Sequence, residues 1–214
     1  MPDEPLLRLE QAAKTYQTDG LPVTALHPTN LTVGRGGFIC LAGPSGSGKT
    51  TVLNLMGGID TPTTGRVLIA GQSTTGLGRA AAAALRREHI GFVFQSFNLI
   101  PVLTAFENVE YVLLLKGVEE AERTARVEEA LAGVGLHRER HKRPAELSGG
   151  QQQRVAVARA IVGAPPIVLA DEPTGSLDSR TGTELLDLLR RLNRERQTTF
   201  VFSSHDPLII ERAD

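Results

Sequence analysis

The stretch "GPSGSGKT", residues 43–50, decides the fold of this chain. It satisfies the pattern G-x-x-x-x-G-K-[ST], follows the apolar run "GFICLAG" (37–43) and opens a predicted helix from Lys49 to Met56. Glycines in this loop let backbone N–H groups wrap a β-phosphate at the positive end of the helix. The Lys49 ammonium can reach the β- and γ-phosphates, and the Thr50 hydroxyl can ligate Mg²⁺. The sequence therefore predicts a nucleoside triphosphate site, and the alternative is a plain glycine-rich turn.

Strands alternate with helices after this loop, which predicts an α/β fold of the P-loop NTPase type with a mainly parallel sheet. The expected strands are the apolar runs at 65–71, 90–94, 166–171 and 198–204, and the clearest helices are 79–88 and 179–195. Since buried parallel strands are apolar on both faces, helices should cover both sides of the sheet. Strands expected at 6–17 and 23–33 flank the turn cluster "TDGLP" and predict an N-terminal antiparallel β subdomain.

A helical region interrupts this alternation between residues 96 and 163. Helices are expected at 104–116 and 119–136, and the first opens with Thr104 and Glu107 at the spacing of a capping box. We therefore expect one domain, in which the α/β core and an inserted helical subdomain share the chain. The expected bounds are 1–214 for the domain, 1–95 and 164–214 for the core, and 96–163 for the helical subdomain.

The composition excludes several classes of protein. Lys and Arg number 23 against 24 Asp and Glu, so no global basic field exists to hold nucleic acid. The single cysteine, Cys40, lies in an apolar run and is expected to be a buried, inert thiol, which excludes a disulfide framework and a cysteine metal cluster. Residues 1–10 lack the apolar segment of a secretory signal, and the apolar stretch near 111–116 is too short to span a bilayer. These features predict a cytoplasmic protein.

Two adjacent carboxylates end the hydrophobic strand in "IVLADEP", residues 167–173. Ligands of parallel α/β sheets bind at the carboxyl ends of the strands, so both acids can face the phosphate loop. Asp171 then suits the shell of a Mg²⁺ ion, directly or through water, and Glu172 can orient and polarise the attacking water. Taken alone, the pair could equally be an acidic strand end beside a proline turn.

Gln95 and His205 each follow an apolar strand directly. Either side chain could reach a γ-phosphate, its Mg²⁺ ion or the water between them. Each residue taken singly could be an ordinary polar strand terminus. Three strands nevertheless end in residues suited to one phosphate site, which favours the functional interpretation.

A second glycine-rich motif follows in "LSGG", residues 147–150. The helix that begins here can offer its N-terminus and the Ser148 hydroxyl to an anion. The alternative is a simple helix cap.

Read together with "GPSGSGKT" and "VLADEP", the stretch "LSGGQ" resembles the ATP-binding subunit of ATP-binding-cassette (ABC) transporters, and the resemblance runs from Tyr16 to His205. It implies that ATP is bound by the Walker A loop, by the ABC signature and by single residues elsewhere. These are Gly43, Pro44, Ser45, Gly46, Ser47, Gly48, Lys49, Thr50 and Thr51 of Walker A, Ser148, Gly149, Gly150 and Gln151 of the signature, Tyr16 as the aromatic stacked on adenine, and Asp178 of the D-loop. It implies that Gln95 is the Q-loop glutamine, Asp171 and Glu172 are the Walker B aspartate and catalytic glutamate, and His205 is the switch histidine.

The resemblance also implies a head-to-tail homodimer with two ATP molecules sandwiched at its interface. Each ATP would lie between the phosphate loop of one protomer and the signature of the other. This arrangement would explain why one chain carries two anion-binding motifs. An integral membrane permease would dock near Gln95 and segment 96–109, placing the protein peripherally on the inner face of the cell membrane. No nucleic acid is expected as a partner, and the alternative is a non-transport ABC ATPase acting on DNA or the ribosome.

Three stretches, at 56–67, 85–110 and 171–182, resemble one subgroup of the family more closely. It includes the lipoprotein-releasing ATPase LolD and the ATPase part of the macrolide exporter MacB, with the cell-division ATPase FtsE as a close relative. The subgroup implies export or extraction of a lipoprotein, lipid, peptide or drug-like substrate. Two features depart from the family pattern: Ser204 stands where threonine is usual, and the sequence stops at Asp214, where family members continue into a final strand pair.

Overall fold

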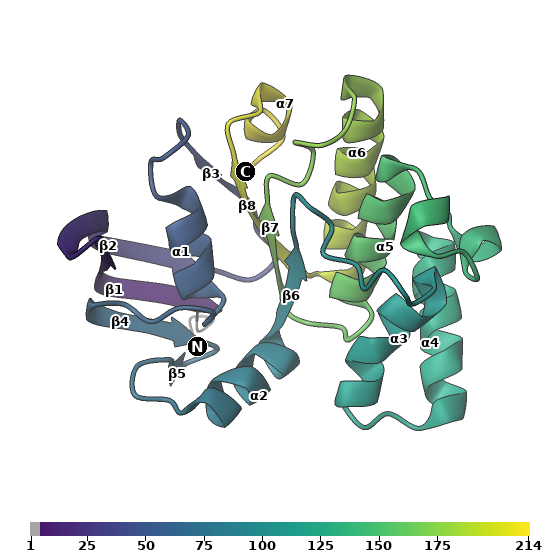
Figure 1. The fold of residues 1–214 in the computed structure, drawn as a ribbon, viewed down its shortest axis with the longest axis horizontal. Coiled ribbons are helices and arrows are strands. Elements are labelled where there is room, and N and C mark those ends of the chain that lie inside the picture. The colour runs from purple at the N-terminus through teal and green to yellow at the C-terminus, as the bar shows by residue number, and fades with distance from the viewer. Residues whose placement is uncertain (1–4) are drawn as a thin grey trace.

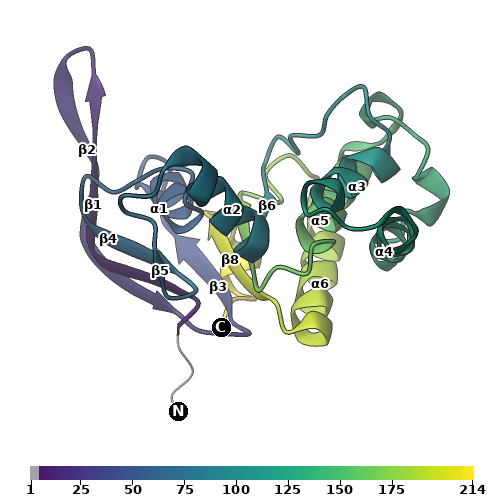
Figure 2. The same cartoon turned by 90° about the horizontal axis from the view of Figure 1, so that it is seen from below.

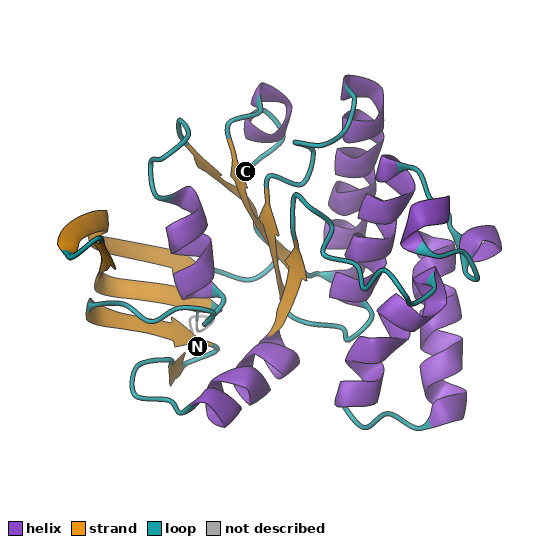
Figure 3. Ribbon diagram, viewed as in Figure 1, coloured by secondary structure: helices purple, strands orange, loops and turns teal. Residues whose placement is uncertain are grey.

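The computed structural model describes residues 5–214, and its strands form two separate sheets (Figure 1 and Figure 3). The first sheet is antiparallel, with the strand order β2-β1-β4-β5. Its strands are β1 (Leu7–Thr18), β2 (Leu21–Val33), β4 (Thr64–Ile69) and β5 (Gln72–Ser73). The hairpin of β1 and β2 turns at Asp19 and Gly20, both with positive φ, inside the predicted turn cluster. The expected antiparallel unit at the N-terminus is confirmed.

The second sheet is parallel, with the strand order β3-β8-β7-β6. Its strands are β3 (Phe38–Ala42), β6 (Ile90–Val93), β7 (Ile167–Asp171) and β8 (Thr199–Ser204). Asp171 at the end of β7 lies opposite Ser203 of β8. Because all four strands run in one direction, the phosphate loop, Gln95, Glu172 and His205 all follow at the same edge of the sheet.

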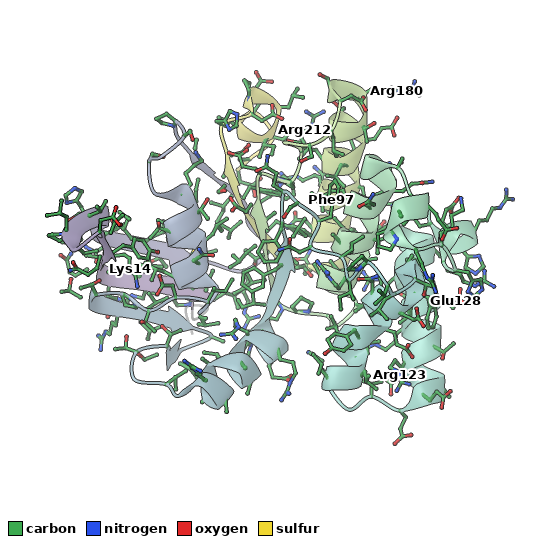
Figure 4. The ribbon with its side chains drawn as sticks, in the orientation of Figure 1. Lys14, Phe97, Arg123, Glu128, Arg180 and Arg212 are labelled. Carbon is green, nitrogen blue, oxygen red and sulfur yellow. The ribbon has the colours of Figure 1, made fainter. Side chains whose placement is uncertain are left out.

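Seven α-helices surround the sheets within the described residues. They are α1 (Lys49–Met56), α2 (Arg79–His89), α3 (Ala105–Leu115), α4 (Glu120–Gly133), α5 (Gly149–Ile161), α6 (Ser179–Arg196) and α7 (Pro207–Ile210). Helices α3, α4 and α5 lie at the end of the molecule opposite the antiparallel sheet, with the parallel sheet between them (Figure 2). In Figure 4, Lys14 marks the antiparallel end and Glu128 the helical end. None of the helices in residues 5–214 combines the length and the apolarity needed to cross a bilayer.

The parallel sheet is buried on both faces, as its apolar strands predict. On one face, Ile167, Leu169 and Val201 join a cluster that includes residues of α1, β1 and β4. On the other face, Phe200 and Phe202 join a cluster formed with α3, α4, α5 and α6. Successive residues of a strand point to opposite faces, so β7 and β8 contribute to both clusters. Their carboxyl ends are consequently held in well-packed positions.

Several local expectations can be compared with the structure. The capping box of Thr104 and Glu107 is present at the start of α3. Helix α4 is shorter than the expected 119–136, because Gly135 adopts a φ of 77°, which is incompatible with helical backbone. Cys40 is half-buried instead of fully buried, and this burial raises the pKa of its thiol.

Asp214 ties the end of the described chain to β3. Its backbone N–H donates to the Phe38 carbonyl at 2.9 Å, and its Oδ2 accepts from the Phe38 N–H at 2.9 Å. Arg190 Nη2 donates to Asp214 Oδ1 at 2.6 Å, and this hydrogen bond holds the pKa of Asp214 below its usual range. These contacts satisfy part of the free edge of the parallel sheet.

Candidate nucleotide-binding site

The phosphate loop connects β3 to α1 and requires glycine where it packs most tightly. Gly46 and Gly48 have φ values of 79° and 88°, in the left-handed region. A Cβ on Gly48 would lie 2.5 Å from the carbonyl oxygen of Ala25 in β2. Gly48 is also the N-cap of α1, so the first free N–H groups of this helix open into the loop. The loop can therefore present backbone donors to an anion.

Lys49 is held across the loop by the backbone of the loop itself. Its Nζ donates to the carbonyl oxygens of Gly43 at 2.7 Å and Pro44 at 2.9 Å. Both acceptors are neutral, so the ammonium charge stays uncompensated by these contacts. A phosphate group bound in the loop would meet this charge directly.

Asp171 lies next to the helix that follows the phosphate loop. Its Oδ1 accepts hydrogen bonds from Thr50 Oγ1 at 3.3 Å and from Ser203 Oγ. The parallel register of β7 and β8 sets Ser203 opposite Asp171 and so orients the carboxylate. A hydroxyl and a carboxylate that converge in this way are hard oxygen donors.

Glu172 has both carboxylate oxygens engaged. His205 Nδ1 lies 2.8 Å from Oε1, and Ser204 Oγ donates to Oε2 at 3.0 Å. The Glu172 side chain is 16% exposed, whereas His205 is 69% exposed, so the acid lies below the histidine at the surface. The backbone of Glu172 has a φ of 44°, a left-handed conformation that is uncommon outside glycine. Strain of this kind persists where the surrounding structure holds it.

Gln95 follows β6, on the other side of Glu172 from β8. Its carbonyl accepts from Ser176 Oγ at 3.2 Å. Its Nε2 lies so close to Gly175 that a Cβ on that glycine would be 2.9 Å away. The loop that follows β7 therefore packs directly against Gln95.

These residues surround one cleft of about 580 Å³. It is lined by Val23, Thr24, Ala25, Ser45, Gly46, Gly48, Lys49, Thr50, Thr51, Gln95, Asp171, Glu172 and His205. The contributions of β2 and of Ser203 and Ser204 were missed by sequence reasoning. The sequence held a weak indication of the two serines. They are hydroxyl residues at the carboxyl end of an apolar strand, directly before His205, and ligands bind at such strand ends.

The signature residues, which the family resemblance assigns to the nucleotide of a partner protomer, do not line this cleft. Ser148 is the N-cap of α5: its Oγ accepts from the Gln151 N–H at 3.3 Å, and its own N–H donates to Gln151 Oε1 at 3.0 Å. A Cβ on Gly150 would lie 2.6 Å from Thr181 Cγ2, so glycine lets α5 approach α6 closely. Within the chain, the first turn of α5 is thus a capped helix start.

Asp178 also lies outside the cleft and caps α6. It accepts from the N–H groups of Arg180 and Thr181 at 3.1 Å each and from Thr181 Oγ1 at 2.6 Å. The Thr181 hydrogen bonds lower the pKa of the Asp178 carboxyl. Asp178 is therefore an ionised N-cap beside the signature helix.

Tyr16 lies on β1 opposite Val23 of β2, one of the residues that line the cleft. Its hydroxyl donates to Asp60 Oδ2 at 2.9 Å, and Lys14 Nζ lies 4.9 Å from its ring centroid. Burial, followed by the bond to Asp60, raises the pKa of Tyr16. Directly opposed residues of antiparallel strands share a face, so Tyr16 lies on the same face as Val23, although Tyr16 itself does not line the cleft.

Comparison with known proteins identifies the family behind this geometry. A family model described as "ABC transporter" matches residues 26–175. The chain belongs to the ABC transporter family. It is an ATP-binding cassette that hydrolyses ATP. The phosphate loop lines the cleft described above.

Among curated ABC relatives, the ABC transporter ATP-binding protein YtrE of Bacillus subtilis is 52% identical over 184 residues, covering 86% of this chain and 80% of YtrE. The macrolide export ATP-binding/permease protein MacB of Brucella melitensis is 45% identical over 214 residues, which cover all of this chain and 33% of MacB. This chain thus spans about a third of that relative's length. The solved ABC cassette MJ0796, dimeric and bound to ADP and Pi, superimposes with a TM-score of 0.89 and 44% identity over 97% of this chain and 91% of MJ0796.

Proposed function

We propose that this ABC cassette works as a homodimer around two ATP molecules and drives a separate integral membrane permease. The observation that carries the proposal is the position of the signature, which lies outside the chain's own cleft while keeping a helix N-terminus for an anion. A second copy in head-to-tail orientation would bring Ser148 and the glycines after it to that cleft. The dimeric state of MJ0796 and the combined ATP-binding and permease name of MacB support this arrangement.

Hydrolysis in the proposed site is an in-line attack of water on the γ-phosphorus. The bond between that phosphorus and the oxygen shared with the β-phosphate breaks, which releases ADP and inorganic phosphate. Glu172 holds the water and accepts its proton, and His205 fixes the carboxylate through Oε1. Lys49 stabilises the negative charge on the β- and γ-oxygens.

Thr50 and Asp171 fit a magnesium ion, because their hydroxyl and carboxylate oxygens already lie 3.3 Å apart at the cleft. Gln95 can add an amide oxygen from the opposite side of the cleft. When bound with ATP, Mg²⁺ would neutralise charge on the phosphate oxygens.

The surface proposed for the permease is a groove of about 500 Å³ between α2, β6, α3 and α5. Its apolar lining includes Phe92, Phe94, Val112 and Leu115. Arg159, another lining residue, donates to the carbonyls of Phe97 and Asn98, and burial lowers the pKa of its guanidinium. An apolar helix that also carries an acidic side chain would complement this groove.

Segment 96–109 contributes to the groove less than its apolar residues suggested. Ala105 and Val109 are buried in the helical core, whereas Ile100 and Val102 are exposed. At the end of α3, Leu114 and Leu115 are exposed as well. Docking here would hold the cassette peripherally on the inner face of the cell membrane.

The test is an affinity capture from detergent-solubilised membranes of the source cell, using Glu172→Gln with ATP. We expect an integral membrane protein to be recovered, and Leu115→Glu in the groove should abolish its recovery. Leu21→Glu, which adds the same charge at an exposed leucine of the β1–β2 hairpin, should leave recovery unchanged. Capture of DNA or ribosomes, insensitive to Leu115→Glu, would favour the non-transport alternative.

A further inference from the structure

Gln153 joins the signature helix α5 to the turn that follows Glu172. Its side chain is completely buried, and Nε2 donates to the carbonyl oxygen of Pro173 at 2.8 Å. Its Oε1 is buried too and accepts no hydrogen bond from any residue between 5 and 214. An unpaired buried amide oxygen destabilises the folded state. The side chain that carries this oxygen is also the one whose amide nitrogen reaches Pro173.

Pro173 belongs to the turn that holds Glu172 in its left-handed conformation. The Glu172 N–H donates to the Ser203 carbonyl at 3.0 Å, and the Glu172 carbonyl accepts from the Gly175 N–H at 3.0 Å. Proline has no N–H, so its carbonyl is the only backbone group through which Pro173 can be held by a hydrogen bond. Gln153 supplies that hydrogen bond from a different element of the fold.

We propose that Gln153 is a positioning residue for ATP hydrolysis. By holding the Pro173 carbonyl, it fixes the turn that aims the Glu172 carboxylate at the attacking water. This inference rests on the proposed role of Glu172. Gln153 does not line the cleft, and within residues 5–214 its side chain forms no hydrogen bond with a residue that does. It therefore acts through the backbone of the turn.

The same contact connects the two sites of the proposed dimer. Ser148 starts α5 and would meet the partner's nucleotide, whereas Glu172 acts on the nucleotide of its own chain. Gln153 follows Ser148 by five residues on the same hydrogen-bonded helix. A displacement of α5 on nucleotide binding would therefore move the Pro173 carbonyl, and with it Glu172, through the single side chain of Gln153.

Gln153→Met tests the proposal, because methionine has a similar length and removes both the donor and the unpaired oxygen. We expect kcat for ATP to fall by about 10- to 100-fold, the effect of a misplaced catalytic group. KM for ATP should stay within about threefold of wild type, since binding contacts are untouched. Amide hydrogen exchange at Gly175 should accelerate, because its acceptor lies on the released turn.

Asn193→Leu is the matched control. Asn193 is another buried amide, whose Nδ2 donates to the carbonyls of Gly36 and Thr198 away from Glu172. This variant should lower Tm and leave kcat of the folded protein unchanged. If Gln153→Met also lowers Tm with kcat unchanged, Gln153 is only a core residue and the proposal is wrong. Normal turnover by Glu172→Gln would instead contradict the proposed function.

Discussion

The two glycine-rich devices of this chain begin helices in similar ways and have different surroundings. The phosphate loop starts α1 beside the ends of β6, β7 and β8, so Lys49, Asp171 and Glu172 share one cleft. The signature starts α5 beside α6, and the Ser148 hydroxyl is engaged by the first turn of its own helix. At the phosphate loop the fold adds the Lys49 ammonium and two carboxylates to the helix N-terminus, and these groups can bind a phosphate together with its metal ion. The signature lies outside this cleft, and in the proposed dimer it would meet the partner's nucleotide.

The largest effect should come from Glu172→Gln, which removes the catalytic carboxylate of the phosphate-loop cleft and leaves ATP binding intact. The amide keeps the shape of the carboxylate and cannot accept the proton of water, so kcat should fall by about 10²- to 10⁴-fold. ATP affinity should be retained, and an ATP-dependent dimer should accumulate. Single-turnover kinetics and size-exclusion chromatography with ATP measure both, and normal turnover would show that another group positions the water.

Mixing two inactive variants tests whether the signature binds the nucleotide of a partner protomer. Lys49→Ala disables the phosphate loop, and Ser148→Arg blocks the signature, so each alone should be inactive. Random pairing of equal amounts puts one intact composite site in half of the dimers, so activity should recover to about a quarter of wild type.

The control mixture combines Lys49→Ala with Glu172→Gln. Both changes disable the phosphate-loop side, so no intact composite site can form and activity should stay absent. Recovery in this control, or mixed dimers without recovery in the first mixture, would contradict a site shared between chains.

A smaller effect is expected from Tyr16→Leu, opposite Val23 of the first cleft. The family resemblance assigns the Tyr16 ring to adenine, so its loss should raise Kd for ATP by about 2- to 10-fold. Tyr16→Phe keeps the ring and loses only the hydrogen bond to Asp60, so its Kd should stay close to wild type. Calorimetric titration of both variants measures this, and equal losses would assign the effect to the Asp60 contact instead of stacking.

The smallest effect should come from Asp214→Asn, which lies outside both regions. The pKa of Asp214 is depressed in the folded state, so its stabilisation is present above its unfolded pKa and is lost as pH falls through the folded pKa. At pH 7 the variant should lose about 0.5–1 kcal/mol of unfolding free energy, the size expected of a partly exposed ion pair. Urea unfolding over a series of pH values below 7 should show a difference that shrinks as the pH falls through the folded pKa of Asp214, with ATP affinity unchanged.

Elements with a strong local signal were predicted well. Helix α1 begins and ends at the expected Lys49 and Met56, because glycines flank it on both sides. The capping box at Thr104 was found for the same reason, since both of its partners lie within four consecutive residues. The predicted end of α4 and the predicted full burial of Cys40 were wrong. The positive φ at Gly135 and the depth of a strand in the fold depend on packing between segments that are distant in the sequence.

The sequence by itself determined the phosphate loop, the acidic pair at Asp171 and Glu172, and the alternation of strands and helices. Each of these is written in consecutive residues and follows from backbone geometry and side-chain chemistry. Only the tertiary structure decided that Ser203 and Ser204 hold the two acids, that the signature lies away from the cleft, and that Gln153 reaches Pro173. Those contacts join segments far apart in the chain, so they depend on strand register and helix packing, which local propensities do not encode.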